Sequence, residues 1–194
     1  MASPRAILIG AGSLALAAGT AAGLIGLTSP AEHSAAPQGA RLQADSGATV
    51  VAASVPKVTR AQVIARAKTW HPHTSSRVPY SQSKTHGGYR TDCSGYASMA
   101  LRLPKPGPNT VGLASSKYSK RISMSQLKKG DLVIDAIGSN TTRHVVIFEK
   151  WTSSKHTAYW AYEQRGHYGT DHRTRTYGLA KGSQYKAYRP KNIT

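Results

Sequence analysis

Residues 129–164 read KGDLVIDAIGSNTTRHVVIFEKWTSSKHTAYWAYEQ and contain the clearest secondary-structure pattern of the chain. Three short runs of aliphatic, β-branched or aromatic residues occur at 132–134, 145–148 and 157–162. Polar segments separate these runs, and the Lys-Gly-Asp triplet at 129–131 is a turn signal before the first of them. Runs of this composition between polar turns are typical of an antiparallel meander. The stretch therefore predicts a small antiparallel β-sheet.

Helical patterns lie on the N-terminal side of these strands. Residues 59–62 have the form of a capping box, and apolar residues follow at helical spacing, which predicts a helix from Arg60 to Trp70. A second helix is expected to include 96–101, and three prolines within 104–108 end it. A last strand is expected over 184–189. Because helices come first and strands afterwards, the sequence predicts an α+β fold with N-terminal helices packed on the antiparallel sheet.

The N-terminal segment has the features of an export signal. Arg5 precedes a run over 6–27 without a charged residue, and small residues near position 31 offer a cleavage site. The alternative is an uncleaved anchor, because a run of this length can span a bilayer. We predict a signal peptide over 1–31, a flexible linker over 32–58 and a single folded domain over 59–194. The expected location is outside the cell, either secreted or associated with the cell wall.

The chain is strongly basic, with 26 Lys and Arg against eight Asp and Glu and a formal net charge of +18. Such a charge attracts polyanions through long-range, salt-sensitive forces. The basic residues are spread along the chain without a helix-turn-helix, zinc-finger or ribonucleoprotein pattern, so we expect no specific nucleic-acid partner. Anionic cell-wall polymers are the partners that we expect this charge to attract, and we expect the protein to be a monomer.

Cys93 is the single cysteine of the chain, which excludes a stabilising disulfide within the molecule. It follows Asp92, a residue type that caps helices well, and precedes the second predicted helix. This position places the sulfur in the first helical turn, where free N–H groups and the helix dipole favour a thiolate. We therefore interpret Cys93 as a nucleophile. The alternatives are a buried small apolar residue or an intermolecular cross-link.

A catalytic cysteine needs a base, and the base needs an orienting group. Among eight histidines, His144 is best placed because it opens a predicted strand, whereas the others fall in the predicted linker, loops or turns. Glu163 or Gln164, at the end of another predicted strand, would orient its ring; alternation puts them on opposite faces, so only one can serve. We prefer Glu163, and its alternative role is a surface ion pair. The pair His71 and His73 lacks further ligands at suitable spacing, so we expect no metal and no cofactor.

The order of four motifs resembles the NlpC-type family of cell-wall cysteine peptidases, which are papain-like enzymes. These motifs are Tyr80, the Asp-Cys-Ser-Gly tetrapeptide 92–95, the Gly-Asp-Leu-Val turn 130–133 and the strand beginning at His144. The resemblance covers roughly 59–164. It implies a papain-like fold and peptidoglycan as substrate. It also implies cleavage between D-γ-glutamate and the diamino acid at the third position of the stem peptide, through an acyl-enzyme.

Carried to this chain, the resemblance makes Cys93 the nucleophile and His144 the base. It also makes Tyr80, Asp92 and Ser94 substrate-binding residues, with Asp92 meeting a stem-peptide ammonium group. The third catalytic position departs from the family, which commonly has histidine where this chain has Glu163 or Gln164. An acidic residue there resembles a related amidase and peptidase branch. The alternatives are therefore a papain-like amidase, a secreted toxin, or a non-catalytic cationic protein that binds the cell wall.

Overall fold

The computed structural model describes residues 54–194. The expected signal peptide and residues 32–53 of the expected linker lie outside the described residues. Helix α1 (Arg60–Lys68) begins after the predicted capping box, in which Thr59 and Gln62 bond to each other's backbone N–H groups. It ends two residues before the predicted Trp70. Within 54–194, no helix combines the length and apolar character needed to cross a membrane.

Short elements follow α1 before the main sheet. The hairpin of β1 (Thr85–His86) and β2 (Tyr89–Arg90) leads into α2 (Cys93–Ala100), and α3 (Thr110–Ala114) follows. The remaining elements are listed here in chain order: β3 (Ser119–Ile122), the short 3-10 helix η1 (Met124–Gln126), β4 (Leu132–Asp135), β5 (His144–Trp151), β6 (Tyr159–Arg165), β7 (Gly169–Arg175) and β8 (Lys186–Pro190).

Six strands form one antiparallel sheet in the order β3-β8-β4-β5-β6-β7. The predicted meander is its centre, because β4, β5 and β6 pair in succession. The mixed α and β class with an antiparallel sheet is therefore confirmed. Two strands of this six-stranded sheet were not predicted: β3 and β7 have many charged residues and no apolar run. The expected loop around His172 is strand β7, and that expectation was wrong.

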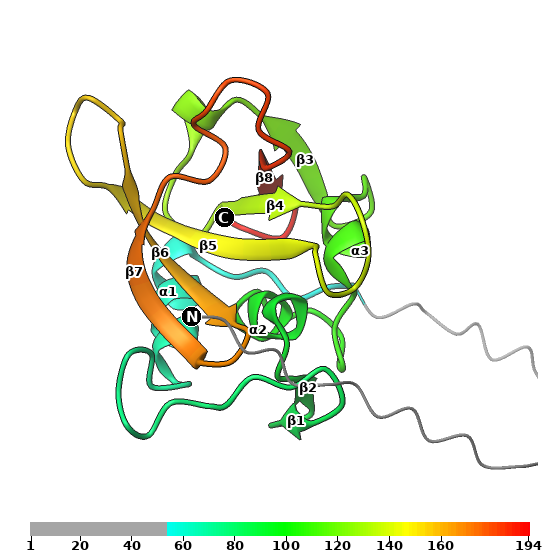
Figure 1. The fold of residues 1–194 in the computed structure, drawn as a ribbon. Helices are drawn as coiled ribbons and strands as arrows, with labels where there is room; N and C mark the ends of the chain where they lie inside the picture. The colour runs from blue at the N-terminus through cyan, green and yellow to red at the C-terminus, as the bar shows by residue number, and fades with distance from the viewer. Residues whose placement is uncertain (1–53) are drawn as a thin grey trace, which may run out of the picture. The chain divides into compact units, whose positions relative to one another are not determined.

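The sheet has apolar residues on both faces. On one face, side chains such as Ile147 and Tyr162 pack with the buried faces of α1 and α2. In Figure 1, α2 lies below β5 and α1 lies behind β6 and β7. On the other face, Val146 and Phe148 pack with Tyr185 and neighbouring residues of the segment between β7 and β8. Packing on both faces of the sheet holds β5 in place. The first residue of β5 is His144, the predicted base.

Candidate active site

The sulfur of Cys93 lies at the N-terminus of α2, as predicted from the sequence. Asp92 is the N-cap residue, and its Oδ1 accepts a hydrogen bond of 2.6 Å from the backbone N–H of Gly95. Cys93 is a free cysteine with 6% of its surface exposed. The N–H groups of a first helical turn have no acceptor within the helix, so their partial positive charge acts on the sulfur. The position is therefore one that favours a thiolate. The same helical turn also orients the backbone N–H of Cys93.

Arg90 holds this helix start in place. Its Nε donates to Oδ2 of Asp92 over 2.8 Å, and its guanidinium also donates to Ser94 Oγ and to two backbone carbonyls. Ser94 Oγ in turn donates to Asp92 Oδ1 over 2.9 Å. Both carboxylate oxygens of Asp92 therefore already have partners. An ammonium group of a substrate would share this carboxylate with Arg90.

His144 and Glu163 are joined across neighbouring strands. His144 is the first residue of β5, and its Nε2 lies 2.8 Å from Oε2 of Glu163 on β6. The Glu163 side chain is fully buried. Burial by itself would lower the pKa of His144, but hydrogen bonding to Cys93 and Glu163 and their negative charges outweigh it, raising the pKa to about 9. Because Nε2 faces Glu163, Nδ1 is the nitrogen left for the sulfur of Cys93.

Arg175 extends this chain of contacts. It lies on β7, and its guanidinium donates to Oε1 of Glu163, the oxygen that His144 does not use. Its side chain is 11% exposed and Glu163 is fully buried, so the pair is shielded from water. Sequence reasoning missed Arg175 because β7 was not predicted, and in so basic a chain one more arginine gives no signal.

Gln164, the other residue considered for the third position, points elsewhere. Its Nε2 donates to the backbone carbonyls of Val78 and Pro79, each over 3.1 Å. Adjacent residues of a strand face opposite sides, so Gln164 anchors the segment before Tyr80 while Glu163 contacts His144. The geometry thus distinguishes the two residues that the sequence left open.

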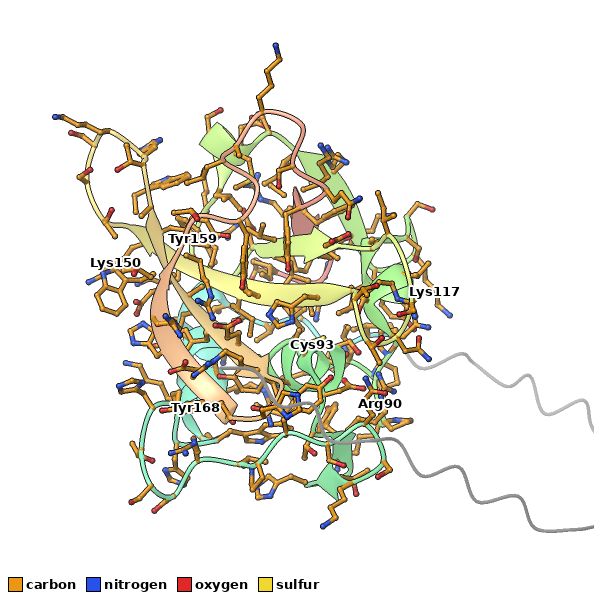
Figure 2. The ribbon with its side chains drawn as sticks, viewed as in Figure 1. Arg90, Cys93, Lys117, Lys150, Tyr159 and Tyr168 are labelled. Atoms are coloured by element: carbon orange, nitrogen blue, oxygen red, sulfur yellow. The ribbon has the colours of Figure 1, made fainter. Side chains whose placement is uncertain are left out.

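A cleft of about 220 Å³ opens beside Cys93. The three expected substrate-binding residues, Tyr80, Asp92 and Ser94, all line it with the cysteine. Burial, together with the negative charges of Cys93 and Asp92, raises the pKa of Tyr80. Figure 2 labels Cys93 below β5, with Arg90 lower and to the right in the same view. The lining residues that sequence reasoning did not single out are Gln82, Arg90, Asn109, Thr110, Asn140 and Arg143.

The histidines considered as metal ligands have a different environment. His73 Nδ1 lies 2.8 Å from Asp171 on β7, and no acceptor or donor contact of the His71 ring occurs among the described residues. Within residues 54–194, no group of three or more His, Cys, Asp or Glu side chains is arranged to hold a metal ion.

No protein-family model and no curated protein sequence matches the chain. A solved structure to which part of this chain is similar is described as the crystal structure of a wild type endolysin LysIME-EF1, with a TM-score of 0.45 and 16% sequence identity. The similarity covers 69% of this chain and 64% of the endolysin chain, so this chain matches less than two thirds of that protein.

Proposed function

We propose that this protein is a papain-like cysteine endopeptidase that hydrolyses peptidoglycan stem peptides between D-γ-glutamate and the diamino acid at the third position. The observation that carries the proposal is the convergence of Cys93, at the start of α2, with His144 and the buried Glu163 on the sheet. A nucleophile, a base and an orienting carboxylate are the groups that cysteine hydrolysis requires. The proposed location is extracellular or at the cell wall.

In the proposed reaction, the Cys93 thiolate attacks the carbonyl carbon of the scissile amide. The backbone N–H of Cys93 donates to the oxyanion that forms. His144 gives its proton to the leaving nitrogen as the C–N bond breaks, which leaves a thioester on Cys93 and a free amine. His144 then accepts a proton from water as that water attacks the thioester. The products are a carboxylic acid and the regenerated thiolate–imidazolium pair.

Glu163 supports both steps through His144. Its carboxylate fixes the ring by the bond to Nε2 and stabilises the protonated imidazole that donates to the leaving group. The raised pKa of about 9 for His144 is consistent with a ring that is protonated when the substrate arrives at neutral pH. In the proposed enzyme, His144 is therefore an imidazolium next to the sulfur of Cys93.

The cleft chemistry is compatible with an acidic peptide. Arg90 and Asp92 largely cancel each other's charge, whereas Arg143 also lines the cleft and no carboxylate among the described residues pairs with it. Stem peptides carry free carboxylates, which a guanidinium binds well. In the proposed complex, Tyr80 and Ser94 contact the peptide and Arg143 attracts its carboxylate.

Digestion of purified muropeptides, followed by mass spectrometry, tests the proposal. The wild-type chain is expected to release fragments cut after D-γ-glutamate, and the Cys93→Ala variant is expected to release none. A control measures the free thiol and the fold of the wild type by thiol titration and circular dichroism. Failure of a folded protein with a free thiol to cut any muropeptide would end the hydrolase proposal.

A papain-like amidase is the second candidate, because the group hydrogen-bonded to His144 is a carboxylate. The endopeptidase family commonly has histidine at this third catalytic position, and an acidic residue there resembles the related amidase and peptidase branch. An amidase would free the intact stem peptide from the glycan, so the fragment masses separate it from an endopeptidase. A non-catalytic wall-binding protein would retain adhesion to walls and show no cysteine-dependent product.

A further inference from the structure

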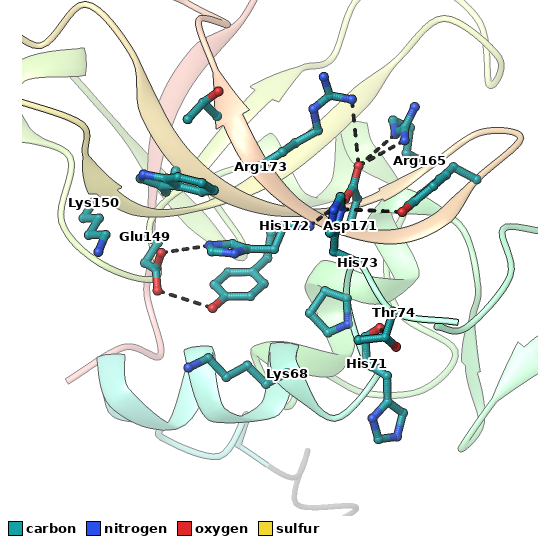
Figure 3. A pocket seen from close by; sticks show the side chains of 15 residues that line it. Lys68, His71, His73, Thr74, Glu149, Lys150, Arg165, Asp171, His172 and Arg173 are labelled. Atoms are coloured by element: carbon teal, nitrogen blue, oxygen red, sulfur yellow. Dashed lines mark hydrogen bonds and ion pairs between the residues drawn. The ribbon is translucent and has the colours of Figure 1, made fainter. Parts of the chain in front are cut away.

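A second and larger groove lies apart from the cysteine cleft. It has a volume of about 970 Å³, and strands β5, β6 and β7 form it with the end of α1 and the loop that follows. None of its lining residues lines the cleft beside Cys93. Figure 3 shows Lys68 on α1 facing the side chains that project from the strands. The proposed reaction uses none of these groups.

Three aromatic rings stand side by side in this groove. The His172 ring stacks between Trp160, at a centroid distance of 5.0 Å, and Tyr162, at 4.2 Å. Glu149 fixes the stack, because its carboxylate accepts from His172 Nε2 over 2.9 Å and from the Tyr162 hydroxyl over 3.3 Å. Tyr162 is buried, whereas Trp160 and His172 are partly exposed. The groove therefore offers a fixed aromatic surface, which packs well against the apolar C–H faces of sugar rings.

Positive charges surround this aromatic surface. Lys68 and Lys150 are exposed, and neither has a carboxylate partner among the described residues. At the other end, Arg165 and Arg173 lie 3.1 and 3.9 Å from the Asp171 carboxylate. Two unpaired ammonium groups beside aromatic rings form a site for anionic groups on a ligand that also has apolar faces.

The geometry points to this groove as a binding site for an anionic glycan, meaning a hydroxyl-rich polymer that carries phosphate or carboxylate groups. Lys68 and Lys150 would bind the anionic groups, and Trp160 would pack on a sugar or polyol unit. Glu149 and Asp171 place negative charge in the groove, which disfavours closely spaced phosphates. They therefore favour a sparsely charged polymer over a nucleic acid. Binding here requires no hydrolysis, so it does not depend on the proposed reaction.

The test measures binding by the full chain carrying Cys93→Ala, which removes the nucleophile from the experiment. The probes are a soluble polyol-phosphate polymer, soluble glycan fragments with stem peptides but no phosphate polymer, and a single-stranded DNA oligomer. The test variant replaces Lys68 and Lys150 by Gln. The control replaces Lys117 and Lys120 by Gln, so that the two variants have the same net charge. Lys117 lies just before β3 and Lys120 lies in it; both are exposed, and β3 is at the opposite edge of the sheet from β7.

The groove variant is expected to bind one or both glycan probes roughly tenfold more weakly, because two charge-assisted contacts are lost. The control is expected to bind within about twofold of the parent, as loss of distant charge weakens binding little at moderate salt. Trp160→Leu removes an aromatic ring without changing the net charge, and it should also weaken binding. Circular dichroism checks that each variant is folded. Preference between the two glycan probes identifies the anionic group. Equal losses in groove and control variants, or DNA binding as tight as glycan binding, would overturn the proposal.

Discussion

Glu163 makes two contacts at once, and both matter for the proposed chemistry. One carboxylate oxygen bonds to His144 and the other to Arg175. Arg175 contacts neither the sulfur nor the cleft, so it acts as a positioning residue through Glu163. His144, Glu163 and Arg175, on the neighbouring strands β5, β6 and β7, therefore form one connected set of polar contacts around a buried carboxylate.

Arg175→Met tests this positioning role. Removal of one partner of a buried ion pair leaves the other charge uncompensated, so we expect unfolding free energy to fall by about 3–5 kcal/mol. We also expect kcat to fall and the pH profile of kcat/KM to shift, because His144 loses its fixed orientation. Arg175→Lys retains the positive charge and should recover part of both losses. Urea unfolding and pH-rate profiles provide the measurements; a Met variant with an unchanged pH profile would contradict the role.

The protonation of His144 gives a second prediction. Its pKa rises from an ordinary 6.5 to about 9 in the folded protein, so folding favours the protonated ring. The stability that this contributes is fully present below pH 6.5 and is lost as pH rises through about 9. Hydrolysis should decline over the upper part of the same range, because the leaving nitrogen loses its proton donor.

Unfolding by urea at a series of pH values, for the wild type and for His144→Gln, measures this effect. The wild type should lose more stability than the variant as pH rises from 6.5 to above 9. Parallel curves for the two proteins would show that the ring is not preferentially protonated in the folded state.

Helix α2 depends on a close approach to the strand before it. A Cβ added at Gly95 would lie 2.0 Å from the backbone carbonyl oxygen of Arg90, a contact that only movement of the backbone can relieve. Gly95→Ala should therefore destabilise the protein by about 1–3 kcal/mol or more and displace Cys93. Gly166→Ala is the control, since nothing lies within 4 Å of its added Cβ. Thermal unfolding and thiol reactivity measure both effects, and equal behaviour of the two variants would contradict the explanation.

Helices α1 and α2 and strands β4, β5 and β6 could be predicted because apolar spacing, caps and turn signals agree in each of them. Strand β7 could not be predicted, because it combines charged residues with a buried Thr170 and Asp171 that satisfy their polar groups through tertiary contacts. Local sequence carries no information on such partners. Arg175 lies on this strand, and so do several residues that line the second groove, including His172. For this reason the sequence predicted neither Arg175 nor the groove.

The candidate catalytic residues were easier to predict than the residues that surround them and hold them in position. Cys93 and His144 sit at the first positions of regular elements, where a cap or a strand onset indicates how they are presented. Alternation along β6 separated Glu163 from Gln164 but left the choice between them to tertiary structure. Arg90 and Arg143 depend on which loops fold beside α2, and the excess of basic residues conceals both.

The acidic residues of the described part are mostly used inside the structure. Asp131 is fully buried and pairs with Arg60 and Arg189, and Asp171 pairs with Arg165. The side chain of Glu163 is also fully buried. The chain has only eight Asp and Glu against 26 Lys and Arg, so the unpaired charge that faces solvent is predominantly positive. Attraction to a polyanion is therefore a property of the whole surface, with the groove as its proposed specific site.

Salt should separate adhesion from hydrolysis. The screening length falls from about 10 Å at 0.1 M salt to about 3 Å at 1 M, so binding of the Cys93→Ala chain to insoluble cell walls should weaken by at least about tenfold over this range. Cleavage of a small soluble muropeptide depends on contacts within the cleft, and we expect kcat/KM to change by less than about threefold. Sedimentation with walls and mass spectrometry of the digest measure the two quantities. If wall binding persists at 1 M salt, short-range contacts rather than net charge hold the protein there.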